Sequence, residues 1–284
     1  MAEPGQPEDV DATQRLKELV LGKPRELRDP RIFHSIALVA FLAWVGLGAD
    51  GLSSSAYGPE EGYKALFEEG ATYLAVALAL ATAVTVFIIS WSYSRIIEAF
   101  PAGGGGYVVP FKLLGPTAGA LSGSALLIDY VLTIAISIAS GVDAVFSYLP
   151  GHLLAWKVPL AVVIVGLLLV LNLRGVKESV TVLAPIFLLF IFTHAVVIVA
   201  GIAIHAGDVG AVAATTAEGY RTGYAELGFF GMLLIFLRAY SMGGGTYTGI
   251  EAVANGMGIM REPRVHTAKR TMIYMSISLA ITAA

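Results

Sequence analysis

The sequence contains no cysteine and few charged residues, and both shortages narrow the possible kinds of protein. Without cysteine, the chain can form neither disulfide bonds nor cysteine-ligated metal sites. Charged residues make up only 14% of the 284 residues, whereas hydrophobic residues make up 56%. This balance is typical of an integral membrane protein.

The sequence also offers no recognisable catalytic or nucleotide-binding arrangement. The five histidines are scattered without the spacing of metal ligands, and no nucleophile–base pair can be identified. The glycine-rich run Phe100–Tyr107 lacks the Gly-Lys-Ser/Thr ending of a phosphate-binding loop and follows no strand. We therefore expect no enzyme, no cofactor and no nucleic-acid partner, and we interpret this run as a tight cytoplasmic connection between two helices.

Apolar segments long enough to cross a lipid bilayer as helices follow a polar start of 31 residues. Residues 1–31 lack the apolar core of a secretory signal, which predicts a cytosolic N-terminal arm before a transmembrane domain over residues 32–284. A seventh apolar segment begins near Arg270 and stops at Ala284, so we expect about seven spans and a longer natural protein. The six complete candidates are Ile32–Leu66, Thr72–Ile97, Gly115–Tyr148, Val158–Leu173, Ser179–Ile204 and Leu227–Met260.

The distribution of lysine and arginine predicts the orientation of these spans. Fourteen of the 18 basic residues precede Ile32 or fall in alternate loops after it, and the opposite loops hold only Lys64, Lys157 and Arg221. Because basic residues gather on the cytoplasmic side, the amino terminus is expected in the cytoplasm of a cell with the chain in its inner membrane. Arg238 lies inside the sixth span, where it could pair with an acid or reach toward the membrane surface.

Two of the predicted spans contain residues that disfavour a regular helix. The first carries Leu47–Pro59, with glycines, three serines and Asp50, and the sixth carries Ser241–Glu251, with three consecutive glycines. We expect the helices to stop at about Gly48–Ser53 and Met242–Thr246. Breaks five spans apart are what an inverted five-helix repeat would produce. Glycines that only permit close helix packing are the alternative.

Polar residues in the third and sixth spans complete a candidate binding site. Asp129, Thr133 and Ser137 are spaced four residues apart and therefore share one face of a helix. Thr248 and Glu251 share a face in the same way, and Glu251 is a candidate proton carrier or a structural hydrogen-bonding group.

Exposed carbonyl groups at the two breaks would add further oxygen ligands. Together with the hydroxyls of Tyr57, Thr133 and Thr248, and with Asp50 nearby, they favour a small monovalent cation. The N–H groups at the same breaks could instead hold a carboxylate, although Asp50 would repel it.

Several of these motifs resemble a known family. The two predicted breaks and the Phe-Pro-x-Gly-Gly-x-x-Tyr pattern of Phe100–Tyr107 resemble the amino acid–polyamine–organocation superfamily over Ile32–Ala284. The resemblance implies an all-α membrane protein with a LeuT-type inverted repeat and discontinuous helices 1 and 6. The run Asp50–Glu61 is more similar to the KUP-like, KimA-type bacterial potassium importers, and two further motifs match them: Asp129-Tyr130-x-x-Thr133-x-x-x-Ser137 and Thr248-Gly249-Ile250-Glu251.

This resemblance implies import of potassium coupled to protons, a homodimer in the full-length form, and regulation by cyclic di-AMP through a C-terminal domain that this sequence lacks. Glu251 would handle the proton, and the cation path would be lined by Asp50, Tyr57, Asp129, Tyr130, Thr133, Ser137 and Thr248. Two alternatives stay open. An amino acid or polyamine permease could also use Asp50 for an amine, and a transporter-like membrane sensor could bind a ligand without moving it.

Overall fold

The computed structural model describes residues 37–284 and five residues of the N-terminal arm, namely Arg15, Lys17, Glu18, Leu21 and Gly22. The rest of the predicted arm, residues 1–31, lies outside the described residues. Within the described part every named element is a helix, which confirms the predicted all-α class. In chain order the elements are α3 (Ala40–Glu68), η1 (Thr72–Leu74), α4 (Ala75–Ala99), α5 (Gly105–Leu114), α6 (Pro116–Phe146), η2 (Gly151–Trp156), α7 (Lys157–Arg174), α8 (Val176–Ile204), η3 (Ala206–Asp208), α9 (Val209–Met242), η4 (Gly243–Tyr247), α10 (Ala252–Asn255), η5 (Gly256–Ile259) and α11 (Arg264–Ala283).

Five segments of the described chain are long and apolar enough to cross a membrane, and they overlap predicted spans two to six, although the last begins at Ala206 rather than at Leu227. They are Thr72–Ala99, Pro116–Phe146, Gly151–Arg174, Val176–Ile204 and Ala206–Ile259. The helix α3, at 29 residues, has the length to cross a bilayer but is less apolar, because its middle carries Asp50 and three serines. The last helix, α11, begins at Arg264 rather than near Arg270.

The predicted break in the first span is wrong, because α3 runs without interruption from Ala40 to Glu68. Its serines are satisfied within the helix: the hydroxyls of Ser53 and Ser54 donate to the carbonyl of Asp50, at 2.8 and 3.0 Å, and that of Ser55 donates to Leu52 at 2.7 Å. The glycine positions serve close packing instead. A Cβ on Gly51 would lie 3.4 Å from the carbonyl oxygen of Thr248. Tertiary packing therefore outweighs the poor helix propensity of this run.

The predicted break in the sixth span is confirmed. The helix α9 ends at Met242, a short 3-10 turn follows over Gly243–Tyr247, and Thr248 is extended with φ −66° and ψ 150°. Gly249 then adopts φ +84°, a left-handed conformation that suits glycine, before α10 begins at Ala252. The same segment is also bent earlier, at Gly228, where φ is 63° and ψ is 177°.

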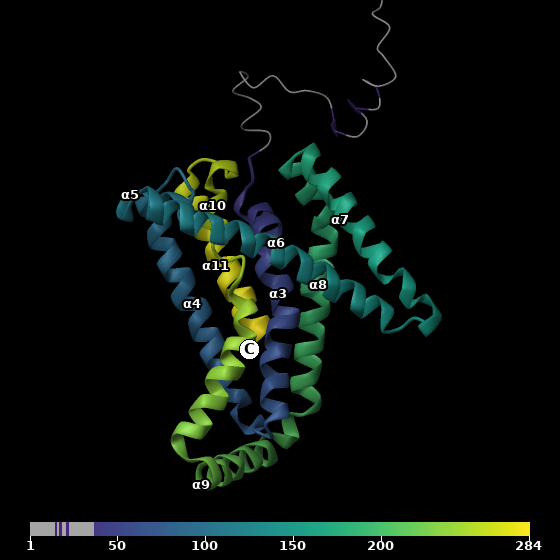
Figure 1. Cartoon of the computed structure of the whole chain (residues 1–284), viewed down its shortest axis with the longest axis vertical. Coiled ribbons are helices and arrows are strands. Elements are labelled where there is room, and N and C mark those ends of the chain that lie inside the picture. Colours follow the sequence, from purple (N-terminus) through teal and green to yellow (C-terminus); the bar gives the residue numbers. More distant parts are fainter. Residues whose placement is uncertain (1–14, 16, 19–20, 23–36) are drawn as a thin grey trace, which may run out of the picture.

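The helix α3 lies at the centre of the bundle, between α11 and α8, and α6 crosses it (Figure 1). Its buried side chains pack mainly against α11 and the sixth span in a core that includes Leu52, Ile250, Met275 and Leu279. The first half of α9, up to the bend at Gly228, lies across the lower end of the bundle in Figure 1. This arrangement brings the polar middle of α3 next to the broken sixth span.

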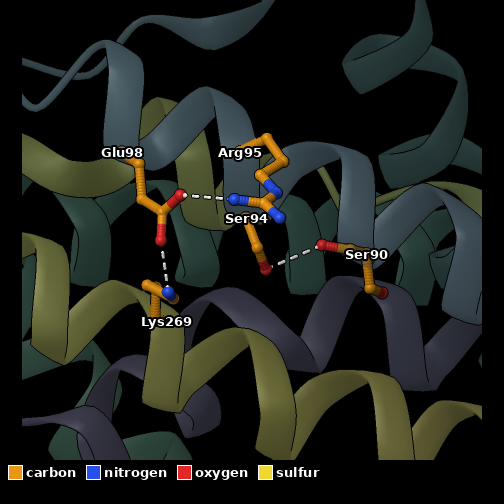
Figure 2. A network of polar contacts seen from close by, with 5 residues as sticks. All are labelled: Ser90, Ser94, Arg95, Glu98 and Lys269. Atoms are coloured by element: carbon orange, nitrogen blue, oxygen red, sulfur yellow. Dashed lines mark hydrogen bonds and ion pairs between the residues drawn. The ribbon is translucent and has the colours of Figure 1, made fainter.

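The connection after α4 differs from the tight turn expected for Phe100–Tyr107. Only Phe100–Gly104 is a loop, and the remaining residues begin the ten-residue helix α5, which packs against α6. Lys269 of α11 bonds to Glu98 at the end of α4, and Arg95 contacts the same carboxylate at 3.4 Å (Figure 2). Basic residues therefore cluster with an acid where these helices meet.

Arg238 in the sixth span forms ion pairs with Glu68 and Glu69 at the end of α3. Of the two interpretations of this residue, the structure supports pairing with an acid.

Candidate functional site

Asp50 lies on α3 directly against the turn that breaks the sixth span. A Cβ added at Gly249 would fall 2.9 Å from the Asp50 carboxyl carbon and 2.6 Å from the backbone nitrogen of Gly51. No larger residue fits there, since such separations are shorter than van der Waals contact. Glycine at position 249 therefore lets the carboxylate of Asp50 approach the exposed backbone of the break.

Hydroxyl groups from both segments gather next to this carboxylate. The Ser54 and Thr248 hydroxyl oxygens lie 2.8 Å apart, and the Thr248 hydroxyl also donates to the carbonyl of Gly245 at 3.0 Å. The hydroxyl of Tyr57 donates to Ser54 at 3.3 Å, one helical turn along α3 from it. Three side-chain oxygens and the carbonyl oxygens of the broken segment thus occupy one small region.

The predicted polar stripe of the third span lies on the face of α6 that meets α3. Thr133 is buried, and Asp129 and Ser137 are half-buried, whereas most of their neighbours on α6 are exposed. The Ser137 hydroxyl lies 3.5 Å from that of Ser53 on α3. The face of α6 that meets α3 is therefore the one that carries Asp129, Thr133 and Ser137, as their four-residue spacing predicted.

Three carboxyl groups share this region of the bundle. Asp50 interacts electrostatically with Asp129, and Glu251 interacts with both. Glu251 is buried, with 7% of its surface exposed, and its Oε1 atom has no hydrogen-bond partner among the described residues. No ion pair joins any of the three to a base within residues 37–284. The region is therefore rich in carboxyl groups and in other oxygen atoms, which are the ligands that a site for a hard cation requires.

Sequence reasoning missed two polar residues of this region. Ser54 contacts Thr248, and Asn255 donates from Nδ2 to the hydroxyl of Tyr130 at 3.0 Å. Their spacing could have revealed both. Ser54 lies four residues after Asp50, and Asn255 lies four residues after Glu251, so each would share a helical face with a predicted site residue. Because a break was expected between Asp50 and Ser54, helical spacing was not applied to this pair.

A comparison with known families gives a match over residues 36–284 to the model described as amino acid permease. The chain belongs to this family. It is also 34% identical over 269 residues to the potassium transporter KimA of Bacillus subtilis strain 168. That alignment covers 94% of this chain and 43% of KimA, so the chain spans less than half the length of this relative.

This permease family lies within the amino acid–polyamine–organocation superfamily, whose members are transporters. The five apolar helices agree with a multi-pass membrane protein. The glycine-rich segment, the carboxylates and the hydroxyls described above accordingly lie in the region that matches the permease family model.

Proposed function

We propose that this protein imports a small monovalent cation, namely potassium, and couples this import to the movement of protons. The observation that carries the proposal is the position of Asp50 against the broken sixth span, among the hydroxyls of Ser54, Tyr57 and Thr248. Hydroxyl and carbonyl oxygens can replace the water around a hard cation, and a fixed carboxylate balances its charge. The 34% identity to a potassium transporter supports the choice of ion.

The cation would lie between α3, the break in the sixth span and α6. Asp129, Tyr130, Thr133 and Ser137 would line the α6 side of its path, and Glu251 would carry the coupled proton. Both assignments rest on burial and proximity to Asp50. Because α3 is continuous, the proposed site needs a break only in the sixth span.

We propose further that the end of the bundle carrying α5 and α10 faces the cytoplasm of the cell. Basic residues at or near this end include Arg95, Lys112, Arg264 and Lys269, and the positive-inside rule favours their cytoplasmic placement.

The substitution Asp50→Asn tests the cation site, because it keeps the shape of the side chain and removes its charge. A carboxylate about 4 Å from a cation contributes about 4 kcal/mol at an effective dielectric of ~20. We therefore expect rubidium uptake by the full-length protein to fall at least about tenfold, since ~1.4 kcal/mol corresponds to a factor of ten. The measurement is isotope uptake in cells that lack their own potassium importers.

Asp143→Asn is the matched control, because Asp143 lies on the same helix α6 as the proposed path but pairs with Lys157 at an exposed position. Its uptake should equal that of the parent. Near-normal rubidium uptake by Asp50→Asn would show that Asp50 does not hold the cation.

An amino acid or polyamine permease is the second candidate, favoured by the description of the matching family. An amine-bearing substrate could also pair with Asp50. Uptake of labelled amino acids and polyamines by the same variants separates the two: the permease hypothesis requires that Asp50→Asn abolish one of these fluxes in a protein that takes up no rubidium.

A further inference from the structure

The glycine-rich loop before α5 packs tightly onto the short helix that follows the break. Gly103 and Gly104 have φ of +88° and +80°, in the left-handed region that favours glycine. A Cβ on Gly103 would lie 3.3 Å from the carbonyl oxygen of Asn255, and one on Gly105 would lie 3.1 Å from the Cβ of Ala254. The run of glycines therefore lets the loop approach the backbone of α10, a role that the cation site does not require.

The side chain of Asn255 stabilises this contact between the glycine-rich segment and α10. Its Oδ1 accepts a hydrogen bond from the backbone N–H of Gly106 at 2.8 Å, and its Nδ2 donates to the hydroxyl of Tyr130 on α6 at 3.0 Å. The backbone N–H of Asn255 donates to the carbonyl of Glu251 at 2.9 Å. One residue thus joins Gly106, the proposed ion path on α6 and the segment that carries Glu251.

The helix α10 needs such an attachment because it has only four residues, Ala252–Asn255. A helix of this length has little stability of its own and takes its position from tertiary contacts. Glu251 directly precedes it, and Tyr130 is the neighbour of Asp129. The position of the proposed proton carrier relative to the ion path therefore depends on what holds α10.

We propose that Asn255 is a positioning residue that latches Gly103–Gly106, the end of the loop and the start of α5, over the site and so closes the path between the site and this end of the bundle. The inference deepens the proposed function and rests on it for the nature of the cargo. Release of the latch would separate Gly103–Gly106 from α10 and expose the side chains of α10 and η5 beneath them.

A single introduced thiol can report this release, since the chain has no cysteine of its own. Met257 in η5 is a suitable position because its Cβ would lie 3.3 Å from a Cβ on Gly103 and the residue is fully buried, so the docked loop covers it. In a cysteine-free full-length protein carrying Met257→Cys, we expect Asn255→Ala to raise the rate of maleimide labelling about tenfold, through loss of both side-chain hydrogen bonds.

Tyr130→Phe removes only one of these bonds and should raise the labelling rate less. Combined with Asn255→Ala it should add nothing, because the two residues act through one contact. Asn172→Ala is the matched control: Asn172 donates to the carbonyl of Leu168 in its own helix, at an exposed position, and its loss should leave the rate unchanged. An unchanged labelling rate in Asn255→Ala, or additive effects in the double variant, overturns the latch.

Rubidium uptake provides a second readout that distinguishes closure from binding. Asn255→Ala leaves the cation-binding oxygens in place, so it should lower the maximal rate several-fold and leave the half-saturating concentration nearly unchanged. A raised half-saturating concentration with an unchanged maximal rate contradicts a role in closure. If the parent protein takes up no rubidium, the proposed function fails, and the labelling experiment still decides the latch.

Discussion

At the scale of single residues, Glu251 stands out as a buried acid with an unpartnered oxygen beside a break in a helix. A buried polar atom without a partner costs free energy, so a role in function is a reasonable explanation for its presence. Its electrostatic interaction with Asp50 and Asp129 means that a cation in the site and a proton on Glu251 would influence each other. This is the physical requirement for coupling an ion to a proton.

The substitution Glu251→Gln tests this coupling because glutamine keeps the size of the side chain and cannot release a proton. Rubidium uptake should stop or lose its dependence on external pH, whereas rubidium binding should partly survive. Uptake measured between acidic and alkaline external pH checks the first point, and Glu226→Gln, at an exposed position on α9, is the control. Parent-like pH dependence in Glu251→Gln would remove this residue from the mechanism.

Residue spacing predicted part of the candidate site. The four-residue interval of Asp129, Thr133 and Ser137 selected one face of α6, and that face meets α3 in the structure. The contact between Asn255 and Gly106 could not be predicted in this way, because it joins residues 149 positions apart and depends on how the helices pack. Local periodicity determines which side chains share a face but not which face of another helix they meet.

At the scale of helices, the contrast between α3 and the sixth span shows where propensity fails. Both contain glycines near an acid, yet α3 is continuous and the sixth span breaks after Met242. In α3 no two glycines are adjacent, and the serines bond to carbonyls of the same helix. In the sixth span three glycines are consecutive, and no side chain among them can support a helical turn.

The close packing of α3 against the broken segment gives a test of stability at Gly58. A Cβ there would lie 2.7 Å from the backbone nitrogen of Thr246, and backbone cannot move aside easily. Gly58→Ala should therefore destabilise the protein by about 1–3 kcal/mol and lower its Tm in detergent.

Gly166→Ala on α7 is the control, because a Cβ at Gly166 meets no atom within 4 Å. Its Tm should be unchanged or raised, since alanine favours helix by about 1 kcal/mol over glycine. Equal Tm values for Gly58→Ala and the parent would contradict the tight contact between α3 and the turn.

At the scale of the whole molecule, the proposed orientation can be tested with single cysteines at the two ends. Lys112 lies at the end of α5, and Glu218 lies on the exposed first half of α9 at the opposite end. An impermeant thiol reagent should label Glu218→Cys in intact cells and should label Lys112→Cys only after the membrane is opened. The reverse result would show that the charge distribution misled the assignment of the cytoplasmic side.

The difference in continuity between α3 and the sixth span also has a mechanical consequence. An unbroken helix of 29 residues such as α3 is stiff. The sixth span can bend at Gly228 and in the non-helical stretch between Met242 and Ala252. The two sides of the site, α3 and the sixth span, therefore differ in stiffness. A conformational change at the site would move mainly the sixth span. The hydroxyl oxygens of Ser54 and Thr248, 2.8 Å apart, lie on either side of the contact between α3 and the broken segment. Any movement of the broken segment relative to α3 would change this distance.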